Sequence, residues 1–422
     1  QFSHVTPAHL SNSFEQACDC DLSWYFDGWI HHAHEIDYRI SHFDREKKEV
    51  TFVNHGPADI PLRFNTYKDG QQIREHTLNG FKGEKTIHLD HRADEIHLYE
   101  GFMGVNRHWS SNINPRSLIP RFGFMPKIES YRSPTIGITP AFGYNLADGF
   151  MAGVALSSGL LPQQHFKFVV APLYGKKSKK IRGYANFRYI NDLKSGPFDK
   201  FLLSLAFDDF GYNVDTHYLF RDHYFRWEPT VAFRLKPTDT NSKISQWLKY
   251  RYVNINQYYG RGQNYEDKIY TEEHRSYGIH ELSYQFRSDE VLKPLEAIGN
   301  VQGGKGFVRL NLRYKQHFVG KDKRRGVWVQ AYGGWLPVYD SPDAAVGFTI
   351  NGMASSGYFS RDYMFDQWLG GRNAESGIFS HQVYEKDAGL KTLSTIGIGD
   401  KWMIGGGASV ALPFKWVHLY MD

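Results

Sequence analysis

The chain has 422 residues, enough for two or three domains, and its 16% aromatic content with 40 glycines is typical of β-rich proteins with many turns. Its 50 basic residues are spread out and nearly balanced by 45 acidic ones, so a nucleic-acid surface is not indicated and no nucleic-acid partner is expected. No run approaches the ~18 apolar residues of a transmembrane helix, which argues against a helical membrane protein but leaves a membrane β-barrel open.

Residues 1 to 30 are predicted to be helical and to end a preceding helical domain. Thr6 followed by Pro7 is a favourable N-cap and first helical position. A second helix start follows at Asp21, and its apolar stripe is expected to pack in a core: Leu22, Tyr25, Phe26 and Trp29.

The two cysteines, Cys18 and Cys20, are separated by one residue. A disulfide at that spacing is expected to be strained, and no second Cys/His pair has zinc-finger spacing. They are therefore predicted to be free or buried thiols.

The stretch "HHAHEIDYRI", residues 31–40, is dense in histidine and suggests a metal site. A zinc peptidase would place H-E-x-x-H on a helix, with the Glu activating water. Neither His34-Glu35 nor His280-Glu281 is followed by the second His, and from Glu35 the residues alternate as in a strand. No catalytic residue, metal ligand or cofactor is assigned in this chain.

Residues 31 to 110 are predicted to form a small antiparallel β-sandwich, followed by a linker at 111–133. Short alternating segments such as "EVTFVNH" and "IPLRFNTYK" are separated by turn signals. Asp69-Gly70 is the clearest hairpin turn among them.

Residues 134 to 422 are predicted to form a transmembrane antiparallel β-barrel. About 12 alternating segments occur, each near the ~10 residues with which a tilted strand crosses a bilayer. The apolar positions of two segments are predicted to face lipid: Val308, Leu310, Leu312, Tyr314, Trp402, Ile404, Val410 and Leu412. Basic positions are predicted to face the lumen: Arg182, Arg188, Arg309, Arg313 and Lys315.

Strands of a soluble β protein also alternate apolar and polar residues. The character of the two faces therefore has to distinguish a soluble protein from a membrane barrel. One face of these segments is wholly apolar and often ends in Tyr or Trp, while the other is basic or small and polar. A soluble propeller is disfavoured because no internal repeat of its period occurs.

The stretch "DLSWYFDGWI", residues 21–30, resembles the terminal helix of aminopeptidase N-like zinc metallopeptidases, which leads into a β-sandwich. The segment from "PAFGYNLADGF" to "NFRYI", residues 140–190, resembles the outer-membrane barrel fused to such peptidases in Bacteroidetes-type bacteria. "GYNLADGF", residues 143–150, is also similar to barrels of the BamA-like assembly family.

These resemblances imply an outer-membrane anchor and a periplasmic sandwich spacer for a membrane-tethered peptidase. The family's zinc site and G-x-M-E-N loop lie upstream of the matched region, and "GFMGVN", residues 101–106, matches that loop only superficially. The parent polypeptide resembles an enzyme, but this chain is expected to be non-catalytic, with zinc only in an upstream domain. The chain ends within a predicted strand, so the barrel is expected to be incomplete here and to have 14 to 16 strands when intact.

Two other functions stay open. The barrel could serve transport or assembly, with its basic residues lining a conduit for anionic or polypeptide cargo. Those residues could equally form salt bridges across the lumen, which is favoured because polar lumens are the rule. It could also be a structural subunit of a larger complex. All three functions place the chain in the bacterial outer membrane, with lipid and other outer-membrane or periplasmic proteins as partners.

Overall fold

The computed structural model describes most of the chain and divides it into two compact units. The first comprises residues 1–137 and 158–163, and the second residues 138–157 and 164–422. The described residues are 6–31, 36–57, 59–98, 113–114, 119–126, 133–160, 164–193, 195–214, 221–239, 242–264, 269–319, 326–340, 350–351, 355–356, 363–366, 383–384, 387–389, 398–412 and 418–421.

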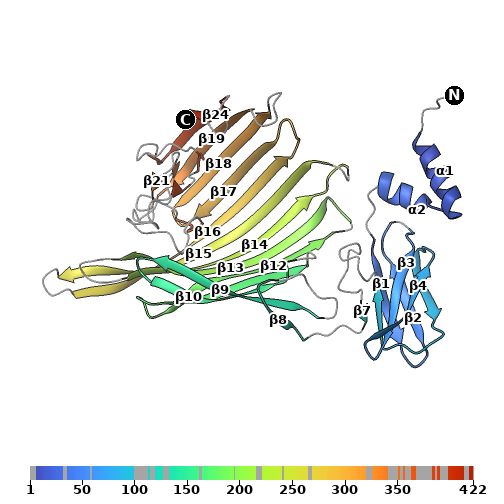
Figure 1. Cartoon of the computed structure of the whole chain (residues 1–422). Coiled ribbons are helices and arrows are strands. Elements are labelled where there is room, and N and C mark those ends of the chain that lie inside the picture. The colour runs from blue at the N-terminus through green and yellow to red at the C-terminus, as the bar shows by residue number, and fades with distance from the viewer. Residues whose placement is uncertain are drawn as a thin grey trace. The chain divides into compact units, whose positions relative to one another are not determined.

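The first unit begins with helix α1 (Pro7–Cys18), as the sequence predicts (Figure 1). Thr6 is its N-cap and accepts a hydrogen bond from the backbone N–H of His9, while Pro7 occupies the first turn. The second helical segment is shorter than expected: α2 (Ser23–Tyr25) continues as one π-helical turn, η1 (Phe26–His31). Trp24 packs against the sandwich core, whereas Tyr25 of the predicted stripe is exposed.

The prediction of free thiols is wrong, because Cys18 and Cys20 form a disulfide. The intervening Asp19 adopts the left-handed conformation, with φ 49° and ψ 45°, and ends α1. This turn brings the two Cα atoms to 5.2 Å, a normal separation for a disulfide. The expectation rested on the one-residue spacing and did not include the left-handed conformation of Asp19.

The rest of the first unit contains the predicted sandwich, built from sheets ordered β1-β2-β5 and β4-β3-β6-β7. Apolar side chains from both sheets share one core, in which the rings of Phe52 and Phe64 lie 4.9 Å apart. The Asp69-Gly70 hairpin forms as predicted, with both residues at positive φ. The strands are β1 (Tyr38–Asp44), β2 (Glu49–Asn54), β3 (Leu62–Lys68), β4 (Gln71–Leu78), β5 (Gly83–His88), β6 (Glu95–Leu98) and β7 (Ile113–Asn114).

The other large part of the fold is a 14-stranded antiparallel sheet. It confirms the predicted fold class, which is mainly β structure ending in a large antiparallel sheet. Its order is β25-β24-β19 and then each strand in sequence down to β8, so neighbours in the chain are neighbours in the sheet, except where β19 meets β24. The strands are β8 (Arg121–Phe124), β9 (Thr135–Asn145), β10 (Gly149–Ser158), β11 (Phe166–Gly175), β12 (Ile181–Asp192), β13 (Phe198–Val214), β14 (Arg221–Leu235), β15 (Ile244–Asn264), β16 (Ile269–Ser288), β17 (Leu295–Gly304), β18 (Phe307–Val319), β19 (Gly326–Tyr339), β24 (Trp402–Ala411) and β25 (His418–Met421).

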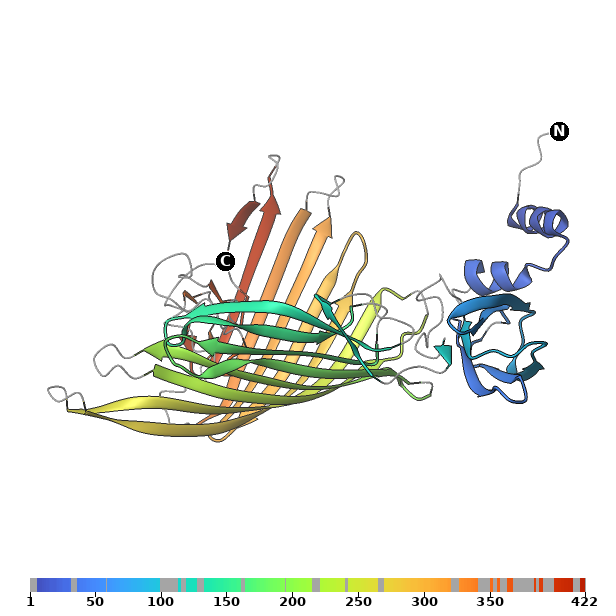
Figure 2. The ribbon, with the colours of Figure 1, turned by 60° about the horizontal axis from the view of Figure 1, so that its bottom comes forward.

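The sheet coils strongly, so that it has a concave and a convex face (Figure 2). Adjacent twisted strands accumulate a rotation, and open sheets of this width curl. β15 and β16 reach 21 and 20 residues, about twice the ~10 needed to cross a bilayer. Their distal ends project beyond the other strands as a two-stranded ribbon (Figure 1).

Residues 340 to 401 separate β19 from β24, although these two strands pair directly. We call residues 340–401 the excursion, and its described residues include four short strands: β20 (Ile350–Asn351), β21 (Ser355–Ser356), β22 (Val383–Tyr384) and β23 (Ile398–Gly399). β20 pairs with β23 and β21 with β22. Within the described residues, no helix combines the length and the apolar character needed to cross a membrane.

Candidate functional site

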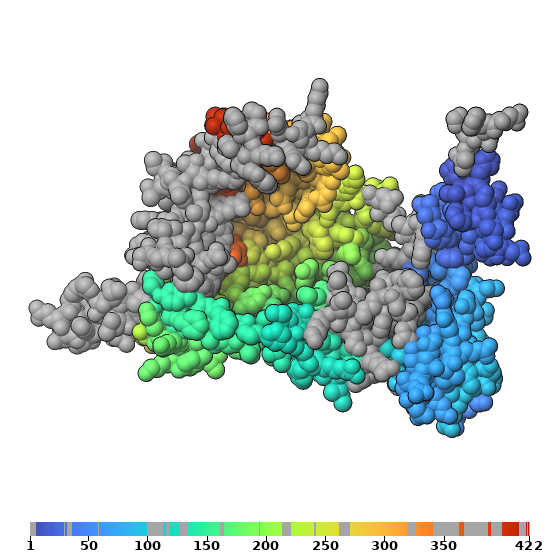
Figure 3. Space-filling model, in the orientation of Figure 1, coloured from blue at the N-terminus to red at the C-terminus, as the bar shows by residue number. Residues whose placement is uncertain are grey.

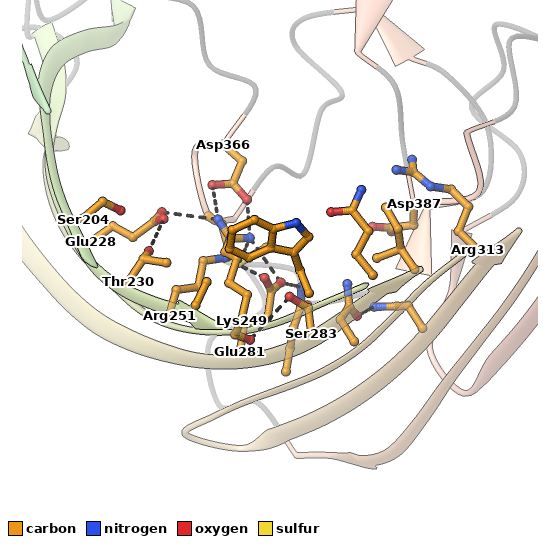
Figure 4. A pocket seen from close by; sticks show the side chains of 18 of the residues that line it. Ser204, Glu228, Thr230, Lys249, Arg251, Glu281, Ser283, Arg313, Asp366 and Asp387 are labelled. Carbon is orange, nitrogen blue, oxygen red and sulfur yellow. Dashed lines mark hydrogen bonds and ion pairs between the residues drawn. The ribbon is translucent and has the colours of Figure 1, made fainter. Parts of the chain in front are cut away.

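The concave face of the sheet holds a polar cavity of about 740 Å³ (Figures 3 and 4). Alternate residues of the strands from β12 to β19 point into it, as the period of a strand requires. The strand residues that line it are Asn186, Arg188, Leu202, Ser204, Glu228, Thr230, Ala232, Trp247, Lys249, Arg251, Glu281, Ser283, Gln285, Ile298, Asn300, Gln302, Arg309, Asn311, Arg313 and Tyr332.

Three of the basic residues predicted to face the lumen, Arg188, Arg309 and Arg313, line this cavity. Lys315 follows on the same strand, one strand period after Arg313, but is not among the lining residues. Arg182 lies elsewhere on the sheet. The structure thus brings three of the five predicted residues together.

Arg182 is buried against the turn that begins in "GYNLADGF". Its Nε lies 3.2 Å from Asp148 Oδ1 and its Nη1 2.6 Å from Asp209 Oδ1. Asp148 also accepts hydrogen bonds from the Asn145 side chain at 2.8 Å and from the Gly211 backbone N–H at 2.7 Å. This arginine therefore fastens the β9–β10 turn to β12 and β13.

An ion network that sequence reasoning missed occupies one side of the cavity (Figure 4). Arg251 lies 2.7 Å from Glu281 through Nε and 2.7 Å from Asp366 through Nη2. Arg226 lies 2.9 Å from Asp208 and 2.6 Å from Asp366. Both arginines also contact Glu228, from the strand beside β15. Four carboxylates thus surround two largely buried cations, as buried charges require.

Asp366 belongs to a short segment, residues 363–366, that lies against the concave face although it comes from the β19–β24 excursion. We call these four residues the inner segment. The Tyr363 carbonyl accepts from the Tyr277 hydroxyl at 2.7 Å, and the Met364 carbonyl accepts from Arg226 Nε at 2.9 Å. Side chains on β14, β15 and β16 therefore hold both its backbone and its carboxylate.

The aromatic residues of the inner segment pack into the wall of the sheet. Phe365 stacks on Tyr224 at 4.2 Å and meets Tyr212 edge-on at 5.5 Å. The Tyr363 hydroxyl accepts from Arg309 Nη1 at 2.8 Å and donates to Gln302. Polar and apolar contacts together fix the segment in one place, in agreement with its buried Tyr363 and Phe365.

A second part of the excursion, residues 387–389, also contacts the concave face. Asp387 forms an ion pair with Arg309, which is only 1% exposed. The Gly389 carbonyl accepts from Gln330 at 3.1 Å, and Ala388 packs with Tyr332 and Leu336. Sequence reasoning could not find these contacts, because Asp366 and Asp387 lie far along the chain from the strands that they meet.

The convex face carries the residues that were predicted to face lipid. Trp402, Ile404, Leu312 and Val410 are exposed by 67%, 79%, 59% and 40% of their surface. The other four are half-buried between their neighbours: Val308, Leu310, Tyr314 and Leu412. Exposed aliphatic and aromatic side chains also cover this face on other strands, among them Leu203, Leu282, Val301 and Trp335. Such an area of exposed apolar surface marks contact with a protein or a membrane.

The histidine-rich stretch can be followed only in part, because residues 32–35 lie outside the described residues, as do residues 101–106. Across the described part of the chain, no group of three or more His, Cys, Asp or Glu residues has the arrangement of a metal site. The candidate functional site is therefore the polar cavity and the inner segment that lies against it.

Comparisons with known proteins give a limited likeness. No family model and no curated protein matches the chain. The crystal structure of BamA from Haemophilus ducreyi lacking POTRA domains 1–3 aligns with a TM-score of 0.35 at 8% identity, over 70% of this chain and 58% of that one. CdiB from Acinetobacter baumannii aligns with a TM-score of 0.31 at 13% identity, over 70% and 52%. The chain spans little more than half of each of these structures.

Proposed function

We propose that this chain forms a β-barrel of the bacterial outer membrane, with its convex face in lipid and its concave face toward a polar lumen. The observation that carries the proposal is the contrast between the two faces of one sheet. The convex face exposes Leu, Val, Ile, Phe, Tyr and Trp side chains, whereas the concave face gathers paired charges and amides. A membrane barrel has this division, with an apolar face in lipid and a polar, hydrated lumen.

The connections between strands support an orientation in this membrane. The tip of the β15–β16 ribbon and the excursion at residues 340–401 belong to the same end of the sheet, because successive strands alternate in direction. Outer-membrane barrels have long extracellular loops and short periplasmic turns. We propose that this end faces outward. The chain then enters β9 from the periplasmic side, and the sandwich that precedes it in the sequence is proposed to be periplasmic.

The barrel acts in transport or assembly, as a conduit that a segment of its own chain occludes. Arg188, Lys249 and Arg313 supply positive charge to the cavity, which suits anionic or polypeptide cargo. The inner segment occupies part of the same space and is held by contacts from β14 to β18. Opening the conduit requires these contacts to break, and partner proteins of the outer membrane or periplasm are the proposed trigger.

Conductance across a planar bilayer tests this function on the full chain. The variant Asp366→Asn combined with Tyr363→Phe weakens the inner segment's side-chain contacts and leaves Arg226 and Arg251 with their wall carboxylates. We expect the wild type to be almost silent and the double variant to open more often and to pass larger currents.

The control is Ser204→Ala, which changes the cavity wall on β13 without removing a charge of the ion network or a side chain of the inner segment. It should be as silent as the wild type. Equal currents from the wild type and the double variant would contradict occlusion by the inner segment. Failure of every form to insert into the bilayer would contradict the barrel itself.

A second candidate function, the anchor of a zinc metallopeptidase, is supported only by the sequence resemblances of residues 21–30 and of the segment that begins at residue 140. The helical segment and sandwich would then be a spacer, and the catalytic groups would lie in polypeptide before Gln1. Intact mass and peptide mapping of the native protein test it: peptides upstream of Gln1 carrying H-E-x-x-H support the anchor, and their absence rejects it.

A further inference from the structure

The polar cavity has a group of side chains beside the ion network that the network does not use. Strand register pairs Lys249 on β15 with Ser283 on β16, and Ser283 with Asn300 on β17. One strand period away, it pairs Trp247 with Gln285. All five residues line the cavity, and we call them the cavity floor. They form one surface, because neighbouring strands lie about 5 Å apart and side chains on one face of a strand repeat every ~7 Å.

The neutral residues of the cavity floor offer hydrogen-bond donors and acceptors together. Asn300 Oδ1 accepts from Asn311 Nδ2 at 2.7 Å, and Gln285 Nε2 donates to Glu296 at 2.8 Å. In the described part of the chain, nothing else accepts from the Asn300 amide group or donates to the Gln285 carbonyl. The Ser283 hydroxyl can both donate and accept. A mixed set of this kind suits ligand hydroxyls, which also donate and accept, better than phosphate oxygens, which only accept.

Trp247 adds an aromatic surface to the cavity floor. Its indole N–H donates to Ser245 Oγ at 3.1 Å, and no ring of the described residues stacks on it. The face of an indole carries negative charge and attracts the partly positive C–H groups of a neighbour. One face of a pyranose ring consists of such C–H groups, while hydroxyls surround its edge. Trp247 therefore suits the ring of a saccharide.

Lys249 supplies the charge of the cavity floor. It lies beside Arg251 in the cavity and forms no ion pair with any residue that the structure describes (Figure 4). The carboxylates of Glu281 and Asp366 are instead held by Arg251, at 2.7 Å each. The Lys249 ammonium group is therefore left to pair with an anionic group of a ligand, and a hydrogen bond between two charged groups is stronger than a neutral one.

We propose that the cavity floor binds a short acidic saccharide. One pyranose ring stacks on Trp247, its carboxylate pairs with Lys249, and its hydroxyls bond to Ser283, Gln285 and Asn300. The side chains that make these contacts come from three adjacent strands of one rigid sheet. The proposal names the cargo of the conduit proposed above, and it rests on that function for the route by which the saccharide reaches the site.

The cavity has room for such a ligand while the inner segment stays in place. Its volume of about 740 Å³ is bounded by Tyr363, Met364 and Asp366 as well as by the sheet. Small-molecule sites have volumes of about 300–1,000 Å³. Binding can therefore be measured on the occluded barrel, without opening it.

Isothermal titration calorimetry of the full chain in detergent tests the proposal, with trigalacturonate as the probe. We expect the wild type to bind one trigalacturonate. Trp247→Leu and Lys249→Gln should each raise the dissociation constant about tenfold, because each removes a main contact. The matched controls are Trp335→Leu on the convex face and Lys305→Gln in the exposed β17–β18 turn, and both should bind as the wild type does.

Two further probes separate the ring from the charge. Maltotriose has pyranose rings but no carboxylate, so it should bind more weakly than trigalacturonate and equally to the wild type and Lys249→Gln. Triglutamate has carboxylates but no pyranose ring, so it should also bind more weakly, and Trp247→Leu should not change its binding.

Triglutamate binding as tight as that of trigalacturonate would assign the cavity floor to polypeptide cargo and overturn the proposal. Equal losses of affinity in the control variants would place the binding elsewhere and overturn it too. Insertion of each form into vesicles, checked by its migration in unheated gels, is measured first. A wild type that inserts but does not bind trigalacturonate refutes the saccharide alone, whereas a wild type that does not insert refutes the membrane barrel and the saccharide with it.

Discussion

Individual charged residues decide how firmly the excursion is held to the sheet. Arg309 is almost fully enclosed, and Asp387 is its ion-pair partner. A buried cation that loses its partner keeps its desolvation cost and loses the compensating attraction. Loss of Asp387 is therefore expected to destabilise the fold because it leaves the charge of Arg309 buried without its ion-pair partner.

Asp387→Asn should lower the free energy of unfolding by about 3 kcal/mol, at the lower end of what breaking a buried pair costs. Urea unfolding of the full chain in lipid vesicles measures it. Asp289→Asn, which removes the partner of exposed Arg287, is the control and should change little. Equal effects of the two substitutions would show that the Arg309 guanidinium is hydrated rather than buried when the chain is in vesicles.

One histidine of the sandwich should make that unit sensitive to mild acid. His76 stacks on Phe64 at 4.6 Å and lies 5.6 Å from the ring of His91. Burial lowers the pKa of His76 below 6.5, and the nearby His91 and Arg74 lower it further. The unfolded chain then binds a proton at higher pH than the folded one, so stability falls as the pH drops below about 6.5.

Calorimetry of the full chain between pH 7.5 and 5.5 should show this fall in the unfolding temperature of the sandwich. His76→Phe keeps a ring on Phe64 but removes the titration, so its transition should move less. Carboxylates contribute little in this window because they titrate near pH 4. An unchanged slope in the variant would assign the acid sensitivity to another group.

Among the elements, the hairpins follow rules that can be taken directly from the sequence. Asp69 and Gly70 have φ values of 51° and 78°, which is the left-handed geometry of a tight turn between β3 and β4. Gly70→Ala should destabilise the sandwich by about 1 kcal/mol, because a Cβ is strained there. Asp69→Asn is the control and should be near neutral, since Asn tolerates this conformation. Thermal unfolding of the two variants measures the difference in stability. An equally small effect of both substitutions would contradict the left-handed conformation at Gly70.

Strands and hairpins were predictable because their signals are local. The alternation of "GFVRLNLRYKQHF" separates the inward Arg309 from the outward Leu312 within one element. The inner segment was not predictable, since Asp366 meets Arg226 and Arg251 only after the sheet has formed. The Cys18–Cys20 disulfide was not predicted for a related reason. It depends on the left-handed backbone conformation of Asp19, which no sequence pattern indicates.

For the whole molecule, the orientation of each side chain across the sheet should decide whether a charge is tolerated. Leu203 and Ser204 are adjacent on β13, with Leu203 exposed on the convex face and Ser204 in the cavity. Leu203→Lys should lower folding stability in vesicles by about 2–4 kcal/mol if the residue lies near the bilayer midplane. Ser204→Lys should cost much less, because its ammonium group stays hydrated. Urea titration of both variants measures this, and similar costs would contradict the assignment of the two faces.

The long excursion between β19 and β24 has a consequence for how the molecule folds. A two-residue turn at Lys305 and Gly306 joins β17 to β18, whereas β19 must find β24 across residues 340 to 401. The chain entropy lost in closing the longer loop is greater by about 3 kcal/mol. Docking of the inner segment divides this loop into two shorter ones, so the Asp366 contacts can form first and bring β24 within reach of its partner. The inner segment, which we propose occludes the lumen, would then also guide the assembly of the last strands.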